Sequence, residues 1–158
     1  MDRQLQIQYL LDHYQRPRHH GALKEADVEM PGGNPGCGDV VTVYLKGAGD
    51  QDHIGEVSYE GEGCTISMAA ASMLLEEVVE DGLTMDQVLE MDFNEMIEKL
   101  GRQIVASRPR CATLGLGTLK AAIRKYQKDK RLAEAGVATP EDGGFVFGEG
   151  AAEAAKKQ

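Results

Sequence analysis

The sequence contains no tryptophan, few aromatic residues and fewer positive than negative charges. Aromatic residues make up 5% of the 158 residues, and 17 Lys and Arg stand against 26 Asp and Glu, for a net charge of -9. A nucleic-acid-binding surface needs a clustered basic face, so this balance argues against a nucleic-acid partner. The chain also lacks a run of about 18 apolar residues, which argues against a membrane-spanning helix.

Cysteine is scarce too, with three copies at positions 37, 64 and 111. The first residues, MDRQLQIQYLLDHY, lack the apolar segment of a secretory signal, so we expect a cytoplasmic protein. Thiols stay reduced there and the number is odd, so no disulfide framework is expected. Two interpretations remain: the cysteines are separate core residues, or they converge on one metal or sulfur site.

Hydrophobic periodicity predicts an α+β domain, a small antiparallel three-stranded sheet with helices packed on one face. Glycine and proline indicate a loop at residues 17–38, between the first helix and the first strand. Gly61 and Gly63 interrupt the second strand and suggest the start of a short third one. His13 in the first helix is interpreted as structural. Residues 1–128 form the expected domain, and 129–158 a largely disordered tail. Helices are predicted at about 4–16, 65–80, 84–91, 94–105 and 111–128, and strands at 39–47 and 54–63.

Each cysteine lies beside a special piece of backbone. Cys37 is in the glycine-rich segment GGNPGCGDV, Cys64 directly precedes a predicted helix, and Cys111 opens another. Helix N-termini carry unpaired N–H groups and a partial positive charge, which favour the thiolate. The thiolate is the form that binds metals and attacks sulfur, so this placement favours the shared-site interpretation.

Asp39 follows Cys37 with only Gly38 between them. In extended backbone, residues i and i+2 point their side chains the same way, so the sulfur and the carboxylate can reach one point. Three thiolates and one carboxylate would give four ligands, which suits zinc or an iron–sulfur cluster. An ordinary exposed turn residue is the alternative for Asp39, and spacing by itself does not decide between them.

Four segments in order resemble one family: LLDHYQRPRHHG, GGNPGCGDVVTVYLK, GEGCTISMAAASMLLE and RPRCATLGLGTLKAAI. Together they are similar to the iron–sulfur cluster assembly scaffolds IscU, SufU and the N-terminal domain of NifU. The resemblance implies that Cys37, Asp39, Cys64 and Cys111 gather at one exposed end and hold a transient [2Fe–2S] cluster or Zn²⁺. It also implies a cysteine desulfurase as sulfur donor, Cys64 or Cys111 as persulfide acceptor, and apo iron–sulfur proteins as recipients.

Two departures from IscU affect the expected role. IscU proteins carry histidine just before the third cysteine, where this chain has Arg110, and their Leu-Pro-Pro-Val-Lys motif is replaced within IVASRPRC. An Hsp70-type chaperone reads that motif, so its loss argues against such a partner. Both departures resemble SufU, which is associated with zinc-dependent sulfur transfer.

Three roles therefore stay open: a scaffold that passes on a labile cluster, a zinc-dependent sulfurtransferase that activates a desulfurase, and an adaptor with structural zinc. The adaptor ranks last, because the predicted helices and sheet can fill a core without metal. A Cys–His enzyme is not favoured either, since no histidine is placed to activate a particular cysteine.

Overall fold

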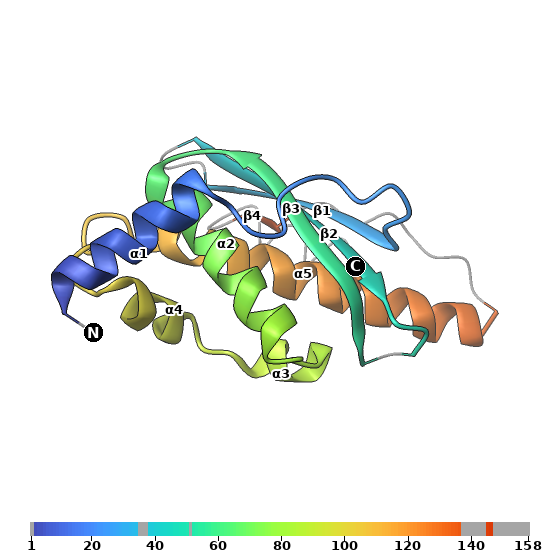
Figure 1. Cartoon of the computed structure of the whole chain (residues 1–158). Coiled ribbons are helices and arrows are strands. Elements are labelled where there is room, and N and C mark those ends of the chain that lie inside the picture. Colours follow the sequence, from blue (N-terminus) through green and yellow to red (C-terminus); the bar gives the residue numbers. More distant parts are fainter. Residues whose placement is uncertain (1, 35–37, 51, 137–144, 147–158) are drawn as a thin grey trace.

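The computed structural model describes residues 2–34, 38–50, 52–136 and 145–146. A small twisted sheet lies on one side, and the helices pack together on the other (Figure 1). The long helix α5 runs beneath the sheet, and α2 lies between α5 and α1. The elements in chain order are α1 (Arg3–Gln15), β1 (Val28–Asn34), β2 (Asp39–Gly47), β3 (Ile54–Glu62), α2 (Thr65–Glu80), α3 (Met85–Glu90), α4 (Phe93–Leu100), α5 (Pro109–Glu134) and β4 (Phe145–Val146).

The predicted α+β class and the three antiparallel strands are confirmed, but one strand is elsewhere than expected. β3 continues through Gly61 to Glu62, and the third strand is β1, inside the segment predicted to be a loop. β1 pairs with β2 over its whole length, and its Val28 and Met30 are buried in the core. Burial of these two side chains outweighs the weak strand propensity of glycine and proline.

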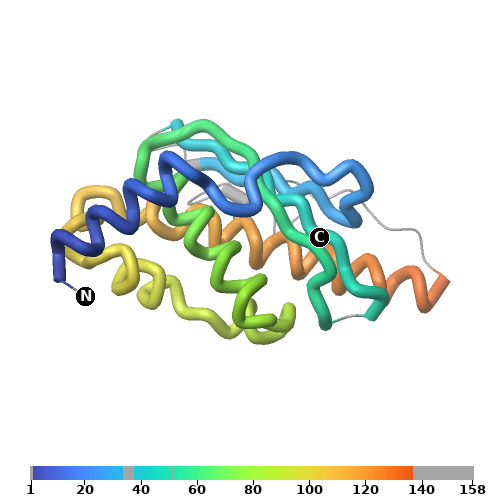
Figure 2. The backbone as a smooth tube through the Cα atoms, in the orientation of Figure 1, coloured from blue at the N-terminus to red at the C-terminus, as the bar shows by residue number. Residues whose placement is uncertain are grey.

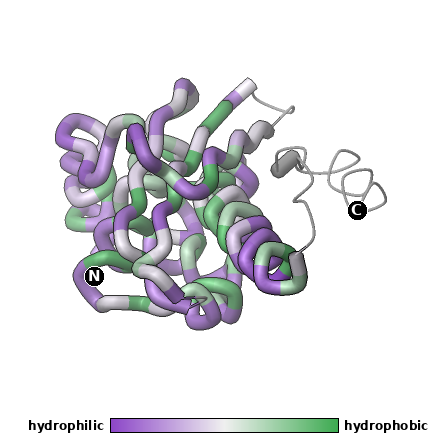
Figure 3. Tube along the Cα trace, turned by 90° about the vertical axis from the view of Figure 1, so that its right-hand side faces the viewer, coloured by the Kyte–Doolittle hydropathy of each residue, from purple (hydrophilic) through white to green (hydrophobic). Residues whose placement is uncertain are grey.

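The core lies between the inner face of the sheet and the helices. Val41, Val43 and Leu45 alternate along β2 and are at most 2% exposed, as the period-two pattern predicts. Leu116, Leu119, Ile123 and Tyr126 supply the facing surface of α5. The trace in Figure 3 shows hydrophobic and hydrophilic residues alternating along the elements. The helices found in the described residues are all too short or too polar to cross a membrane.

Small residues let α2 and α5 approach each other closely. A Cβ built on Gly115 of α5 would lie 3.2 Å from the Cα of Ala71 of α2, tighter than most such contacts. Cys64 caps the start of α2, and Cys111 lies one turn before Gly115 in α5. The close packing of the two helices therefore brings the residues at their N-termini together.

The last helix runs to Glu134, past the predicted end at Lys128. Phe145 and Val146 form a two-residue strand that pairs in parallel with Gly32 and Gly33 of β1 and extends the sheet to the order β3-β2-β1-β4. The rest of the segment predicted to be a disordered tail, 137–144 and 147–158, lies outside the described residues. Figure 2 shows the described residues as a coloured tube, with α1 at the front and β1 and β2 behind β3.

Candidate metal centre

Asp39 is the first residue of β2, and its side chain is buried against the start of α2. It is 3% exposed. Its Oδ1 accepts the backbone N–H of Cys64 at 3.0 Å, and its Oδ2 accepts the hydroxyl of Ser67. A buried carboxylate without such donors would be costly, so these bonds explain how Asp39 is tolerated here. The exposed-turn alternative for this residue is wrong.

Cys64 occupies the N-cap position of α2, where Ser, Thr, Asp or Asn is usual. Its Sγ accepts the backbone N–H of Ser67 at 3.5 Å, and it lies 3.5 Å from Oδ2 of Asp39. Gly63 allows this approach, because a Cβ on it would lie 2.7 Å from Oδ1 of Asp39. The sequence Gly63-Cys64 thus places a half-buried thiol against the carboxylate.

Cys111 is the third residue of α5 and is 1% exposed. One ligand atom each of Asp39, Cys64 and Cys111 lies within 4.8 Å of the other two. No other group of three His, Cys, Asp or Glu side chains in the described residues is close enough to hold a metal ion in this way. The fourth expected ligand, Cys37, lies outside the described residues.

The surroundings of Cys64 favour its thiolate. Burial raises the pKa of this thiol, and the negative charge of Asp39 acts in the same direction. Hydrogen bonds from the Ser67 side chain, the Ser67 backbone and Cys111 stabilise the thiolate and outweigh both effects, so the pKa is lowered overall. A thiolate is the form that binds a metal and attacks a sulfur atom.

The donor set fits a tetrahedral metal ion with sulfur and oxygen ligands. Zn–S bonds of about 2.3 Å place two sulfur ligands about 3.8 Å apart in a tetrahedron. The observed separations of up to 4.8 Å exceed this by no more than about 1 Å, which small side-chain rotations can close. Asp39, Cys64 and Cys111 can therefore hold zinc or the iron of a cluster, with one position left for a further ligand.

The site is less open than the resemblance implied. Asp39 and Cys111 are both buried, and only Cys64 is half-buried. Two contacts cover these side chains. α2 packs closely on α5, and β2 pairs with β3, whose last residue Glu62 lies opposite Val40. Among the described ligands, Cys64 is the one a partner can reach most easily.

Ser67 belongs to the site but was not among the residues predicted from the sequence. It is the third residue of α2, and its hydroxyl contacts both Asp39 and Cys64. The side chain of an N-cap residue accepts a hydrogen bond from the backbone N–H two or three residues later, so residue 67 is expected to lie next to Cys64. That capping rule is the signal in the sequence that could have identified it.

A second buried polar cluster surrounds His13, which supports its structural interpretation. His13 is fully buried, and its Nδ1 is 2.7 Å from the hydroxyl of Ser72. Burial lowers the pKa of His13 most, Arg18 adds to the effect, and Glu76 and Asp12 partly oppose it. The imidazole therefore stays neutral at neutral pH.

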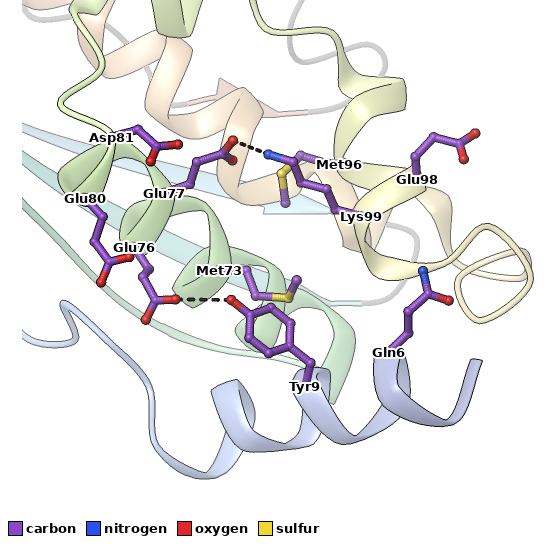
Figure 4. A pocket seen from close by; sticks show the side chains of 10 residues that line it. All are labelled: Gln6, Tyr9, Met73, Glu76, Glu77, Glu80, Asp81, Met96, Glu98 and Lys99. Carbon is purple, nitrogen blue, oxygen red and sulfur yellow. Dashed lines mark hydrogen bonds and ion pairs between the residues drawn. The ribbon is translucent and has the colours of Figure 1, made fainter. Parts of the chain in front are cut away.

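A concavity of about 460 Å³ lies between α1, α2 and α4 (Figure 4). Its rim is acidic, but several of the carboxylates already have partners. The hydroxyl of Tyr9 donates to Glu76, and Lys99 pairs with Glu77. None of the expected ligands lines this concavity; the lining residues are Gln6, Tyr9, Met73, Glu76, Glu77, Glu80, Asp81, Met96, Glu98 and Lys99.

The fold and the site together define a small α+β protein in which cysteine and aspartate side chains meet at a candidate metal site. The family described as "NifU-like N terminal domain" matches residues 6–133, and the chain belongs to this family.

Two relatives illustrate the similarity. The chain is 35% identical over 127 residues to the iron-sulfur cluster assembly scaffold protein IscU of Aquifex aeolicus, covering 80% of this chain and 79% of that one. It is 31% identical over 135 residues to the zinc-dependent sulfurtransferase SufU of Bacillus subtilis, covering 76% of this chain and 90% of that one. The crystal structure of the N-terminal part of a NifU-like protein from Brucella abortus shares the fold, with a TM-score of 0.65 and 20% identity over 77% of this chain and 93% of that one.

Proposed function

We propose that the protein is an iron–sulfur cluster assembly scaffold. It accepts sulfur from a cysteine desulfurase, builds a labile [2Fe–2S] cluster on Cys37, Asp39, Cys64 and Cys111, and passes the cluster to apo-proteins. The observation that carries the proposal is the convergence of Asp39, Cys64 and Cys111, which are far apart in the sequence, on one point. The names of the relatives in Aquifex aeolicus and Bacillus subtilis support it.

Sulfur transfer would begin at Cys64, the more accessible of the two described thiols. Its thiolate attacks the outer sulfur of the persulfide on the desulfurase. A new S–S bond forms on Cys64, the S–S bond of the donor breaks, and the donor cysteine leaves as a thiolate. The step needs no external oxidant or reductant, because one persulfide replaces another.

The aspartate ligand accounts for release of the cluster. A carboxylate is a harder ligand than a thiolate and suits iron–sulfur chemistry less well. A cluster held by three thiolates and Asp39 is therefore expected to be more labile than one held by four cysteines. A donor protein needs this lability, whereas an electron carrier does not.

A zinc-dependent sulfurtransferase is the second candidate. The observation that favours it is Arg110, which stands where IscU proteins have a histidine, together with the fit of the donor set to zinc. In this role Cys37, Asp39, Cys64 and Cys111 would hold zinc, which would keep the thiols as thiolates, and Cys64 or Cys111 would take up the sulfur. The partner is again a cysteine desulfurase, whose turnover the protein stimulates. The sequence IVASRPRC gives no reason to include an Hsp70-type chaperone in either role.

We place either role in the cytoplasm, where the thiols stay reduced. We assign this role to the predicted domain, residues 1–128, whose last helix α5 runs on to Glu134, and keep 129–158 as the predicted tail.

Anaerobic reconstitution with ferrous iron, a cysteine desulfurase, free cysteine and a thiol reductant tests the proposal. A scaffold develops the visible absorption of a [2Fe–2S] cluster and then activates an apo-ferredoxin. A zinc-dependent sulfurtransferase instead raises desulfurase turnover, loses this effect when zinc is removed, and forms no cluster. Failure of both activities would contradict both roles.

A further inference from the structure

The hydroxyl of Ser67 lies between two of the expected ligands. Its Oγ donates to Oδ2 of Asp39 and is 3.5 Å from Sγ of Cys64. The side chain is 2% exposed, so water does not compete for these contacts. The backbone N–H of the same residue also donates to Sγ of Cys64 at 3.5 Å. One residue therefore contacts both the carboxylate and the thiol.

These bonds hold both oxygens of Asp39 in place. Oδ1 accepts from the backbone N–H of Cys64, and Oδ2 accepts from Ser67. A hydroxyl has one proton, which Ser67 can give to Oδ2 of Asp39 or to Sγ of Cys64. Oδ2 also lies 3.5 Å from Sγ of Cys64, whose thiol can donate to it. When Cys64 gives up this proton to bind a metal as a thiolate, Oδ2 can turn the same position towards the metal. Asp39 can thus coordinate without giving up its bond to Ser67.

We propose that Ser67 is a positioning residue, which orients Asp39 and Cys64 for metal or cluster binding. The inference rests on the proposed function insofar as Asp39 and Cys64 are ligands. Hydrogen bonds to metal ligands fix their orientation, and their loss typically weakens metal affinity about 10- to 100-fold. Without Ser67, Oδ2 of Asp39 loses its hydroxyl donor, and the carboxylate is less firmly oriented beside the sulfur.

A structural role makes a different prediction. If Ser67 only satisfied the buried Asp39 within the fold, its loss would lower the stability of the protein and leave the affinity of the folded state for metal unchanged. Ser72 offers a matched control on the same helix. It is also fully buried and hydrogen-bonded, but its hydroxyl contacts His13 and the backbone of Arg18.

The test compares zinc affinity of the full chain, measured by competition with a chromophoric chelator, for the wild type, Ser67→Ala and Ser72→Ala. We expect Ser67→Ala to bind zinc about 10- to 100-fold more weakly and to change the visible spectrum of the cobalt(II) form. Ser72→Ala is expected to lower the urea midpoint and to keep the zinc affinity and the cobalt spectrum of the wild type. Unchanged zinc affinity in Ser67→Ala, or an equal loss in Ser72→Ala, would overturn the inference.

A second pair of variants covers the case in which Ser67→Ala does not fold. Ser67→Thr and Ser67→Val have nearly the same shape but differ in the hydroxyl. Tighter zinc binding by the Thr variant supports the role of the hydroxyl, and equal binding by both overturns it. If the wild type binds zinc but transfers no cluster to an apo-ferredoxin, the scaffold function fails while the inference on Ser67 stands. If the wild type binds no metal, both fail.

Discussion

Oδ2 of Asp39 lies 3.5 Å from Sγ of Cys64, although the two residues are 25 positions apart in the sequence. The hairpin of β2 and β3 creates this contact. Because the two strands are antiparallel, the end of β3 returns to the beginning of β2, where Val40 lies opposite Glu62. The chain then enters α2 directly after Gly63. The sheet therefore carries the carboxylate to the N-terminus of the helix that Cys64 caps.

Exchange of the carboxylate for a thiolate should stabilise the cluster. In Asp39→Cys all four expected ligands are sulfur, which iron–sulfur clusters prefer, so we expect loss of the cluster to a chelator to be on the order of tenfold slower. Transfer to an apo-ferredoxin should slow in parallel. Absorption of the reconstituted protein over time measures both rates. Decay at the wild-type rate would show that Asp39 does not set the lability.

Gly63 should be intolerant of any side chain. A Cβ there would lie 2.7 Å from Oδ1 of Asp39, so Gly63→Ala must displace the carboxylate. We expect a loss of about 1–3 kcal/mol in the free energy of unfolding and about tenfold weaker zinc binding. Gly33→Ala is the control, because its Cβ would meet only the backbone oxygen of Asp39 at an ordinary 3.9 Å. Similar zinc affinity in the two variants would argue against this role of Gly63.

Stability should fall as the pH drops below about 6.5, the usual pKa of histidine. His13 has a lowered pKa in the folded state, chiefly because it is buried. Above pH 6.5 His13 is neutral in both the folded and the unfolded state, and its full contribution to the free energy of unfolding is present. Between pH 6.5 and the lower pKa of the folded state, the unfolded chain binds the proton first, and folding loses free energy.

Urea unfolding at pH 7.5 and 5.5 measures this effect. The midpoint of the wild type should fall more over this interval than that of His13→Gln, whatever the stability of the variant at pH 7.5. His53 changes the stability in the opposite direction as the pH falls, because its hydrogen bond to Asp50 raises its pKa. The wild type and His13→Gln both contain His53, so its effect cancels in the comparison. Equal shifts of the two midpoints would exclude His13 as the source.

Cys64 should take up sulfur before Cys111. Cys64 is half-buried with a lowered pKa, whereas Cys111 is 1% exposed. After incubation with a desulfurase and cysteine, mass spectrometry of the metal-free protein should find the added sulfur on Cys64. We expect Cys64→Ala to lose most of this product and Cys111→Ala to keep it. If Cys64→Ala instead forms as much persulfide as the wild type, and carries it on Cys111, then Cys111 is the first sulfur acceptor and the assignment to Cys64 is wrong.

Much of the fold follows from local patterns in the sequence. α2 has the predicted bounds, and α3 lies within the helix predicted at about 84–91. β1 was missed because Gly32 and Gly33 and the proline before them indicate a loop. Pairing with β2 and the buried Val28 and Met30 determine its structure instead, and those are contacts at long range.

The candidate site shows the same division. Cys64 and Cys111 could be placed at helix starts from the sequence, because capping and proline signals are local. Their meeting depends on the close approach of Gly115 to Ala71, which no local pattern reports. Burial of Asp39 in β2 depends in the same way on a long-range contact, the hydrogen bond from the hydroxyl of Ser67 in α2. Contacts between secondary-structure elements therefore determine the meeting of Cys64 with Cys111 and the burial of Asp39, which local sequence patterns do not report.

Metal analysis of the anaerobically purified protein, with cobalt(II) titration of the metal-free form, tests the central claim most directly. The account predicts one tetrahedral cobalt ion per chain, with thiolate-to-cobalt charge-transfer absorption that weakens in Cys64→Ala and in Cys111→Ala. Absence of this absorption in the wild type, or a spectrum that neither substitution changes, would show that these sulfur atoms do not share a metal.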